Sequence, residues 1–415
     1  MSGRVRVASP RLLLLQTTPD ARLILIARGV RAFGDGFVSV LLPLHLTTVG
    51  LPAGQVGLIT TATLLGSAML TLLAGALADR WKRHDLLVRA SLLMIFTGVG
   101  FAVADDFWPL LAVAFVGTMN PTAGDVSVFL PTEQSLLSVT VAPEHRTALF
   151  ARYTLIGVLV AAVGALAAGI PDLLTSILPM SLSRALDAMF VLYAALGVVT
   201  LAINHRLSED VEPPADAPPS RLGSSRRAVY QMAAVFSLDA FAGGFTMNAI
   251  IAFWLFLRFD LATSTAGLIF FWAGLLSAGS QLVAPMLAQR IGLINTMVFT
   301  HLPANVFLLL TPFMPNVELA VACLLGRFAL AQMDIPARTS YVMAVVTPPE
   351  RPAAASITNV PRSLAPAVSP TFAGKLLGMT TFGWPLVIGA SLKIVYDLLL
   401  LAMFRHRSPP EEQHR

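Results

Sequence analysis

Runs of about 20 mainly apolar residues recur along the whole chain. A helix needs about 20 such residues to cross roughly 30 Å of hydrocarbon, because each residue adds about 1.5 Å. A bilayer offers no water to backbone polar groups, so each run must satisfy its own hydrogen bonds as a helix. The sequence predicts an all-α membrane protein with twelve transmembrane helices. The predicted spans are residues 22–47, 54–78, 86–104, 108–140, 147–169, 186–204, 229–257, 264–288, 293–313, 317–346, 354–374 and 382–404.

The composition agrees with this class and excludes others. The chain of 415 residues is 56% hydrophobic and 12% charged, with a mean hydropathy of +0.74, which is not the composition of an ordinary water-soluble domain. The net charge of +5 would suggest nucleic acid in a soluble protein, but here the cations lie in short loops. We expect no nucleic-acid partner, and the single cysteine, Cys323, rules out an intramolecular disulfide.

Cations collect in alternate loops, beginning with the N-terminal tail, whereas the opposite loops hold only Arg184, Arg258 and Lys375. The positive-inside rule therefore predicts that both termini are cytoplasmic. We expect a multi-pass protein of the plasma membrane that works as a monomer in the lipid bilayer. The excess of arginine over lysine suggests a GC-rich bacterial genome, and for a bacterial protein the membrane expected is the inner membrane.

A polar stretch rich in proline and serine divides the chain into two halves. We predict a cytoplasmic tail (1–21), a six-helix bundle (22–204), a cytoplasmic linker (205–228), a second six-helix bundle (229–404) and a C-terminal tail (405–415).

The two halves resemble each other in sequence. Phe33-Gly-Asp-Gly-Phe37 in span 1 aligns with Phe241-Ala-Gly-Gly-Phe245 in span 7, and Gly57-Leu-Ile in span 2 aligns with Gly267-Leu-Ile in span 8. Two parallel, pseudo-symmetric bundles suit a rocking motion around a site between them.

The loop between spans 2 and 3 reads Gly75-Ala-Leu-Ala-Asp79-Arg80-Trp-Lys82-Arg83. It resembles the signature between the second and third helices of the major facilitator superfamily, Gly-x-Leu-Ala-Asp-Arg-x-Gly-Arg-Arg/Lys, with Lys82 in place of the second glycine. The turns around residues 143–146 and 349–351 resemble the superfamily loops after the fourth and tenth helices. The resemblance covers residues 22–404 and implies a transporter with a cytoplasmic gate made of Gly75, Asp79, Arg80, Arg83, Glu144, Arg146, Glu350 and Arg351.

Ionisable side chains are rare inside membrane spans and usually face a cavity. Here they concentrate in spans 1, 4, 7 and 10, the helices that line the central cavity in the superfamily. We predict cavity and gate charges at Arg31, Glu133, Asp239, Arg327 and Arg338.

The repeat alignment suggests how these charges pair. Glu133 is equivalent to Arg338, and Arg31 is equivalent to Asp239. We therefore predict two opposite-charge pairs across the cavity, Glu133 with Arg338 and Arg31 with Asp239, which act either as a gate or as permanent structural pairs.

Three further carboxyls, Asp35, Asp334 and Asp125, have no cation at the repeat-equivalent position. They are the candidates for a proton-coupling group, with Asp35 or Asp334 ahead of Asp125. Asp35 could instead pair with Arg31 one turn earlier. In span 12 we expect Lys393 and Asp397, also one turn apart, to neutralise each other.

Substrate contacts are predicted at Asn120, Phe37 and Asn248. Asn120 precedes Pro121 in span 4, where a kink would free backbone carbonyls for substrate or serve packing alone. Phe37 belongs to an aromatic set in spans 1 and 7 that either meets an amphipathic substrate or packs in the core.

These features together predict a secondary active transporter working by alternating access, with proton-coupled export of small organic molecules as the first candidate. The antiporter signature of the fifth helix is missing, so uptake by a symporter or uniporter of an organic anion or other metabolite is the alternative. A non-transporting receptor is a remote third. We expect no enzyme, since no metal-ligand spacing, nucleophile motif or phosphate loop is found, and no cofactor, with the proton gradient as the energy source.

Overall fold

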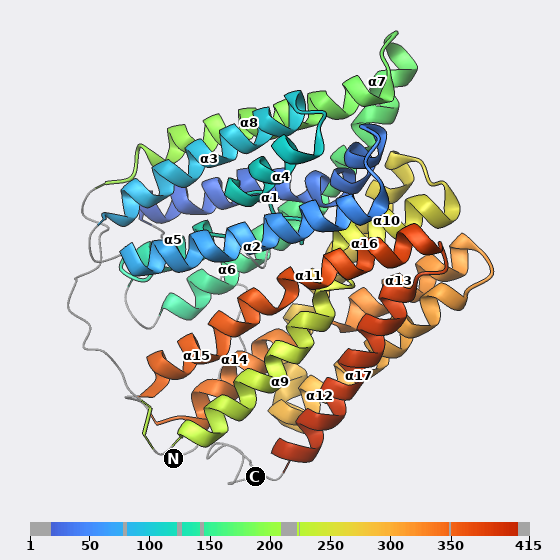
Figure 1. The fold of residues 1–415 in the computed structure, drawn as a ribbon. Coiled ribbons are helices and arrows are strands. Elements are labelled where there is room, and N and C mark those ends of the chain that lie inside the picture. Colours follow the sequence, from blue (N-terminus) through green and yellow to red (C-terminus); the bar gives the residue numbers. More distant parts are fainter. Residues whose placement is uncertain are drawn as a thin grey trace.

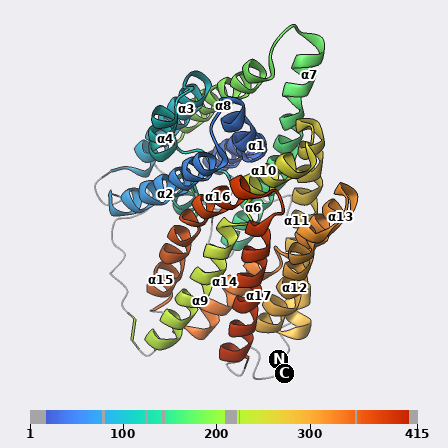
Figure 2. The ribbon, with the colours of Figure 1, turned by 45° about the vertical axis from the view of Figure 1, so that its right-hand side comes forward.

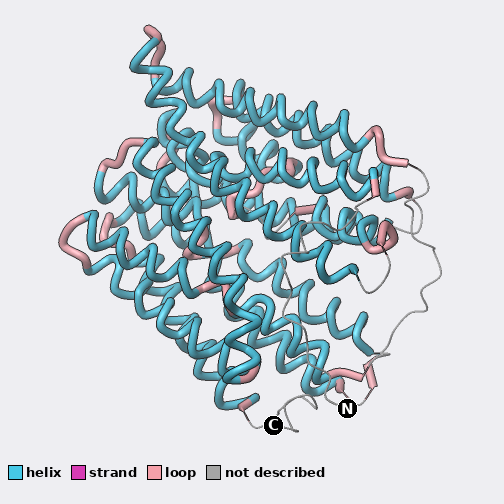
Figure 3. The backbone as a smooth tube through the Cα atoms, turned by 180° about the vertical axis from the view of Figure 1, so that it is seen from behind, coloured by secondary structure: helices cyan, strands magenta, loops and turns pink. Residues whose placement is uncertain are grey.

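The computed structural model describes residues 18–77, 81–122, 127–141, 145–208, 222–223, 225–347 and 350–405. All regular elements in these residues are helical (Figures 1 and 3). The first part of the chain forms α1 (Pro19–Thr48), α2 (Ala53–Leu77), α3 (Arg83–Val103), α4 (Phe107–Val116), α5 (Phe129–Leu137), α6 (Arg146–Leu166), the 3-10 turn η3 (Ala167–Gly169), α7 (Ile170–Ile177) and α8 (Leu182–Asn204).

The second part is built in the same way. It forms α9 (Arg226–Gly244), α10 (Asn248–Phe259), α11 (Thr263–Ile291), α12 (Leu293–Leu310), the 3-10 turn η5 (Thr311–Phe313), α13 (Val317–Leu330), α14 (Asp334–Val345), α15 (Arg351–Leu364), the 3-10 turn η7 (Ala365–Ala367), α16 (Ser369–Met379) and α17 (Trp384–Phe404). In two views most of the helices α1–α8 lie in the upper part of the molecule and most of α9–α17 in the lower part, with α10 reaching up to α1 (Figures 1 and 2). We call these groups the N-half and the C-half.

Local sequence explains the helix ends. The α1 helix begins where the hydroxyl of Thr18 accepts a hydrogen bond from the Ala21 N–H (3.3 Å), followed by Pro19 at the first position and Asp20 in the first turn. Asp20 also accepts hydrogen bonds from the N–H and hydroxyl of Ser208 (3.0 and 2.7 Å), so the start of α1 is fixed to the residues that follow α8.

Nine helical segments of the described chain are long and apolar enough to cross a membrane. Predicted spans 1, 4 and 11 are not among them. Helix α1 is 30 residues long, but Arg28, Arg31 and Asp35 lower its hydropathy. Spans 4 and 11 are each divided into two short helices. Spans 7 and 10 are also broken, at residues 245–247 and 331–333.

The breaks in spans 4 and 7 meet each other. The carbonyl of Pro121 accepts a hydrogen bond from the Ala249 N–H at the start of α10 (3.3 Å). The kink predicted at Asn120-Pro121 therefore frees a carbonyl, and in this conformation the C-half takes it. We had considered that this carbonyl would contact substrate, but in this conformation it forms a contact between the two halves.

The repeat found in the sequence reappears as equivalent close approaches of helices. A Cβ built on Gly57 would lie less than 3.0 Å from the Pro370 carbonyl oxygen of α16, and one on Gly267 would lie as close to the Ala165 carbonyl oxygen of α6. These two glycines occupy equivalent positions in spans 2 and 8. They join the halves along two symmetric seams, α2 with α16 and α6 with α11.

The seams lie near one end of the molecule, where α2 and α11 begin. There Thr61 Oγ1 accepts hydrogen bonds from the N–H and hydroxyl of Thr371 (3.1 and 2.8 Å), and Asp172 Oδ2 accepts one from the Ser264 N–H (2.8 Å). At the opposite end of α2, a Cβ added to Gly75 would meet nothing within 4 Å. Gly75 of the predicted gate therefore contacts no other described helix in this conformation.

Candidate functional site: a polar cavity between the halves

A cavity of about 250 Å³ lies between α1, α5 and α6 of the N-half and α10, α11, α13 and α14 of the C-half. Arg28 is the one charged side chain among the described residues that line it. The other polar lining residues are Ser39, Thr122, Gln134, Tyr153, Thr154, Asn248, Ser277, Gln281 and Gln332. A larger hollow of about 410 Å³ between α2 and α4 has an almost wholly apolar lining that includes the exposed Leu58, Leu65 and Trp108, as expected of a surface that faces lipid.

A buried ion pair lies beside the cavity in the N-half. Arg31 on α1 donates to Glu133 Oε2 on α5 (2.6 Å), and the Tyr153 hydroxyl on α6 donates to the same oxygen (2.5 Å). The Arg31 guanidinium stacks over the Phe129 ring, 4.0 Å from its centroid. Three helices of the N-half are therefore tied together around one carboxylate.

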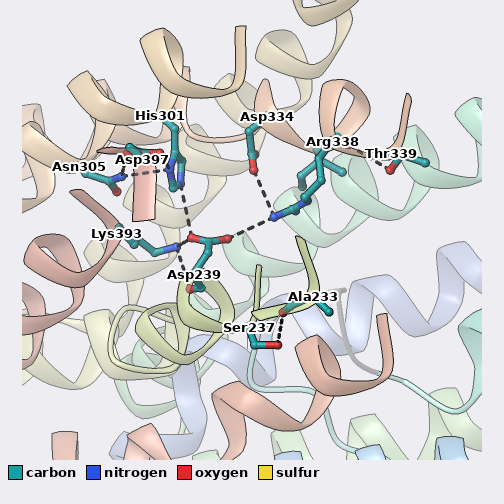
Figure 4. A network of polar contacts seen from close by, with 11 residues as sticks. Ala233, Ser237, Asp239, His301, Asn305, Asp334, Arg338, Thr339, Lys393 and Asp397 are labelled. Carbon is teal, nitrogen blue, oxygen red and sulfur yellow. Dashed lines mark hydrogen bonds and ion pairs between the residues drawn. The ribbon is translucent and has the colours of Figure 1, made fainter. Parts of the chain in front are cut away.

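A larger network lies in the C-half, with Asp239 of α9 at its centre (Figure 4). Its carboxylate accepts from Lys393 Nζ of α17 (2.5 Å) and from Arg338 Nη1 of α14 (3.2 Å), and His301 Nε2 of α12 lies 3.9 Å away. Arg338 Nη1 also lies 3.4 Å from Asp334 one turn earlier.

The same network continues to Asp397 of α17. Its carboxylate lies 2.8 Å from His301 Nδ1 and accepts a hydrogen bond from Asn305 Nδ2 (2.9 Å). Our expectation that Lys393 and Asp397 neutralise each other is wrong, because Lys393 contacts Asp239 and Asp397 contacts His301. These two residues point in different directions from α17 (Figure 4), which a spacing of four residues does not reveal.

The predicted pairs across the cavity are also wrong for this conformation. Arg31 pairs with Glu133 and Asp239 pairs with Arg338, so both partners of each pair belong to the same half. The repeat-equivalent positions are used in both halves, but with reversed signs. The first helix of the N-half supplies the cation, and the first helix of the C-half supplies the anion.

The structure separates the proton-coupling candidates. Asp334 has a cation partner in Arg338. The carboxylate of Asp35 is buried, and among the described residues it accepts no hydrogen bond and forms no ion pair, since Arg31 binds Glu133 instead. Arg28 and Arg31 are the cations whose charge acts on it from the same helix. Asp125 lies outside the described residues.

Sequence reasoning missed Arg28, which lines the cavity, and gave no role to His301. The signal for Arg28 was its spacing, since Arg28, Arg31 and Asp35 at i, i+3 and i+7 share one face of a helix. The other predicted cation, Arg327, is partly exposed and stacks over the Phe328 ring at 4.7 Å, but it does not line the cavity.

The three predicted substrate contacts differ in position. Asn248 lines the cavity. Asn120 is buried, and its side-chain oxygen accepts from the Thr122 N–H and hydroxyl (3.0 and 2.6 Å), so it holds the break in span 4. Phe37 is fully buried in the core, and in this conformation it cannot touch a solute.

The predicted gate motif is described only in part, because Asp79, Arg80 and Glu144 lie outside the described residues. Arg83 begins α3 and Arg146 begins α6. Arg351 donates from Nε to the Met343 carbonyl (3.1 Å).

Glu350, which was predicted as a residue of the cytoplasmic gate, makes hydrogen bonds in this conformation. Its carboxylate is buried and accepts hydrogen bonds from the hydroxyls of Thr347 and Ser225 (2.7 Å each) and from the Gly223 N–H. It joins the residues that precede α9 to the turn before α15. Among the described residues it pairs with no cation.

These hydrogen bonds predict a pH-dependent contribution to stability. The hydrogen bonds from Thr347, Ser225 and the Gly223 N–H lower the pKa of Glu350 from 4.5 to about 2. A carboxyl with a lowered pKa stabilises the folded state above its ordinary pKa, and this contribution is lost as the pH falls through the folded-state value. We expect Glu350→Gln to lower the unfolding temperature at pH 7 and 5, with a difference from wild type that shrinks between pH 4.5 and 2. A difference that is independent of pH would contradict this. The control is Glu318→Gln, which removes an exposed carboxylate in the first turn of α13.

Comparisons with known proteins agree with this architecture. The sequence profile of the Major Facilitator Superfamily matches residues 24–333. The "Uncharacterized membrane protein YJR124C" of Saccharomyces cerevisiae is 23% identical over 421 residues, covering 93% of this chain and 94% of its own. Since this relative is a yeast protein, a bacterial origin stays a prediction.

Two transporter structures superpose on almost the whole chain. A bacterial homolog of the human lysosomal transporter Spinster, in an inward-facing and occupied conformation, gives a TM-score of 0.73 at 15% identity, covering 96% of this chain and 98% of its own. The nucleoside transporter NupG gives 0.71 at 14% identity, covering 94% and 100%. At these identities the likeness shows the fold alone. With the profile matching most of the sequence and the repeat visible in the helix packing, this chain belongs to the Major Facilitator Superfamily.

Proposed function

We propose that the protein is a secondary active transporter that moves a small organic molecule by alternating access and couples this movement to protons. The family and fold point to membrane transport rather than to an enzyme. The coupling, the substrate and the direction go beyond the family.

One observation carries the proposal. The halves touch along the α2–α16 and α6–α11 seams at one end of the molecule, and a polar cavity lies between them. Two bodies joined at one end and free to rock can expose the cavity first to one side of a membrane and then to the other. A solute bound between them would be carried across.

Asp35 is the proposed proton site. It is a buried carboxyl beside the cavity helices, and in the described chain it lacks the ion pair that Glu133, Asp239 and Asp334 each have. A carboxylate held by a cation resists protonation. A buried carboxylate without such a partner accepts a proton more easily. We keep Asp334 second and Asp125 third.

Two directions of transport remain as candidates. Export is the direction we expected from the sequence. Uptake of an organic anion gains support from one observation, that the only charge on the described cavity lining is the cation Arg28. We further propose a monomer in the plasma membrane with both termini cytoplasmic, as the loop cations suggest.

The test is solute-driven proton movement in proteoliposomes that contain a pH dye, screened against lipophilic cations, sugars and organic acids. For the solute that moves protons in wild type, we expect Asp35→Asn to reduce the proton flux to the level of empty liposomes, because asparagine cannot bind or release a proton. Asp260→Asn, an exposed site after α10, should behave as wild type. Unchanged coupling in Asp35→Asn would reject this residue, and Asp334→Asn would then be tested.

A further inference from the structure

Arg28 is a buried cation that forms no ion pair with any described residue, and the carboxylate on which its charge acts, Asp35, lies two turns further along α1. The Arg28 side chain on α1 is only 6% exposed and lines the cavity. Its Nε is buried and has no hydrogen-bond partner, and within the described chain the guanidinium donates no hydrogen bond and forms no ion pair.

The three other described cations that are as deeply buried differ from it. Arg31 contacts Glu133, and Arg338 and Lys393 contact Asp239. A buried charge is strongly destabilising unless an opposite charge and hydrogen bonds compensate it. Among the described residues, Arg28 therefore lacks the carboxylate partner that each of these three cations has.

The position of Arg28 is nevertheless well defined. Its guanidinium carbon lies 5.3 Å from the centroid of the Tyr153 ring, and Tyr153 is held in turn by Glu133. A Cβ added to Gly157 would lie 2.6 Å from Arg28 Nε, so this glycine leaves room for the guanidinium. The side chain is held in place while its hydrogen-bonding groups stay unused.

The positive charge of Arg28 also has no equivalent in the C-half. In the repeat alignment that equates Arg31 with Asp239, the counterpart of Arg28 is Phe236 and the counterpart of Asp35 is Gly243. The C-half therefore offers neither a second cation nor a second free carboxyl at these positions. An anion in the cavity would be held from the N-half.

We propose that Arg28 binds the oxyanion group of the substrate, and that the substrate is a small organic anion carrying a carboxylate or a phosphate ester. Five N–H donors in a planar fork suit either group. The inference rests on the proposed function, because it takes the cavity to be the transport site.

The other residues that line the cavity indicate what the remainder of the substrate is like. The amides of Gln134, Gln281 and Gln332 line it and have no hydrogen-bond partner among the described residues, so they can bind hydroxyl or carbonyl groups. Phe270 and Phe328 add an apolar wall from the C-half. A volume of about 250 Å³ is below the range of drug-sized ligands. These features favour a compact polar anion.

The binding test uses molecules that differ in charge but little in shape. Glucose, glucuronate and glucose 6-phosphate form one set, and benzamide and benzoate another, each titrated against the purified full-length protein. We expect at least one anion to bind more tightly than its neutral analogue, and Arg28→Gln to weaken that binding about tenfold or more. The two sugar anions distinguish a carboxylate from a phosphate ester. Equal affinity for the neutral and charged members, or unchanged affinity in Arg28→Gln, would overturn the inference.

Two further variants separate charge from geometry. Arg28→Lys keeps the charge but loses the fork, and Gly157→Ala keeps the arginine but displaces its guanidinium, so both should weaken anion binding less than Arg28→Gln. Arg258→Gln removes an exposed cation in the last turn of α10 and should leave the affinity unchanged. Equal losses in Arg28→Gln and Arg258→Gln would indicate a general effect of net charge and contradict a site at Arg28.

A second measurement needs no ligand. If Arg28 is kept for binding, its uncompensated charge destabilises the empty protein, so Arg28→Gln should raise the unfolding temperature by about 2 °C or more. An unchanged or lower unfolding temperature would make Arg28 a structural residue and overturn the inference, whichever solute is the true substrate.

The inference and the proposed function fail in different ways. Anion binding that depends on Arg28, without solute movement in proteoliposomes, would support the anion site and reject the transporter. Coupled transport of a neutral or cationic solute that survives Arg28→Gln would support the transporter and reject the anion site.

Discussion

Replacing Asp239 with asparagine is expected to lower the free energy of unfolding by about 3–5 kcal/mol. Asp239 neutralises Lys393 at 2.5 Å and Arg338 at 3.2 Å inside the C-half. Arg338 would keep Asp334, but Lys393 would retain only the carbonyl of residue 239, at 3.4 Å. The penalty is therefore chiefly that of one buried, uncompensated ammonium group.

The measurement is thermal or denaturant unfolding of the purified protein, with a double-mutant cycle as its control. Lys393→Met in the Asp239→Asn background removes the orphaned charge and should recover most of the lost stability. Asp260→Asn, which removes an exposed carboxylate, should change it little. If the double variant is as unstable as Asp239→Asn alone, the cost does not come from Lys393 and the account is wrong.

Replacing Gly57 with alanine is expected to depopulate the conformation described here by about 5- to 150-fold. The added Cβ would meet the Pro370 carbonyl oxygen and the backbone of Gly374 at or under 3.0 Å, and backbone atoms cannot move aside as a side chain can. Overpacking of this kind costs about 1–3 kcal/mol, which corresponds to that range of populations. The equivalent variant Gly267→Ala should act in the same direction at the other seam.

Cross-linking across the seam measures this population. Thr61 and Thr371 lie with their hydroxyls 2.8 Å apart, so a disulfide between Thr61→Cys and Thr371→Cys reports contact between α2 and α16, with Cys323 replaced by serine. We expect less cross-linking in Gly57→Ala and in Gly267→Ala. Gly279→Ala is the matched control on α11, since its Cβ would meet nothing within 4 Å. Equal cross-linking in Gly57→Ala and Gly279→Ala would show that the seam tolerates a methyl group.

The fold was predictable from the sequence because its strongest signals are local. Hydropathy located most helices, and the spacing of Gly57 and Gly267 in the two halves marked positions that are equivalent in space. Average hydropathy revealed none of the breaks in spans 4, 7, 10 and 11, because it does not change where a backbone bends. Pro121 gave a local signal for one of them, whereas the break at residues 245–247 contains no proline.

The site was only partly predictable, for a different reason. Repeat alignment tells which positions are equivalent, but not which side chains meet. Arg31 and Glu133, predicted as cavity and gate charges, are both buried, but their pairing depends on the distance between α1 and α5, which no sequence separation encodes. The contact between Lys393 of α17 and Asp239 of α9 could not be predicted for the same reason.

The placement of both partners of each ion pair within one half has an electrical consequence. When one rigid half moves against the other, a pair such as Arg31–Glu133 or Asp239–Arg338 travels as a neutral unit. Such a unit does no work against a membrane potential, whereas an unpaired charge that crossed the full potential would gain or lose about 2.3 kcal/mol per 100 mV. Arg28 and Asp35 carry opposite charges on the same helix, so these two described residues also sum to zero when the cavity is empty. An anion on Arg28 and a proton on Asp35 together leave that sum at zero, whereas either one alone leaves a net unit of charge. A current carried by the transport cycle would therefore show that the anion and the proton are not bound together.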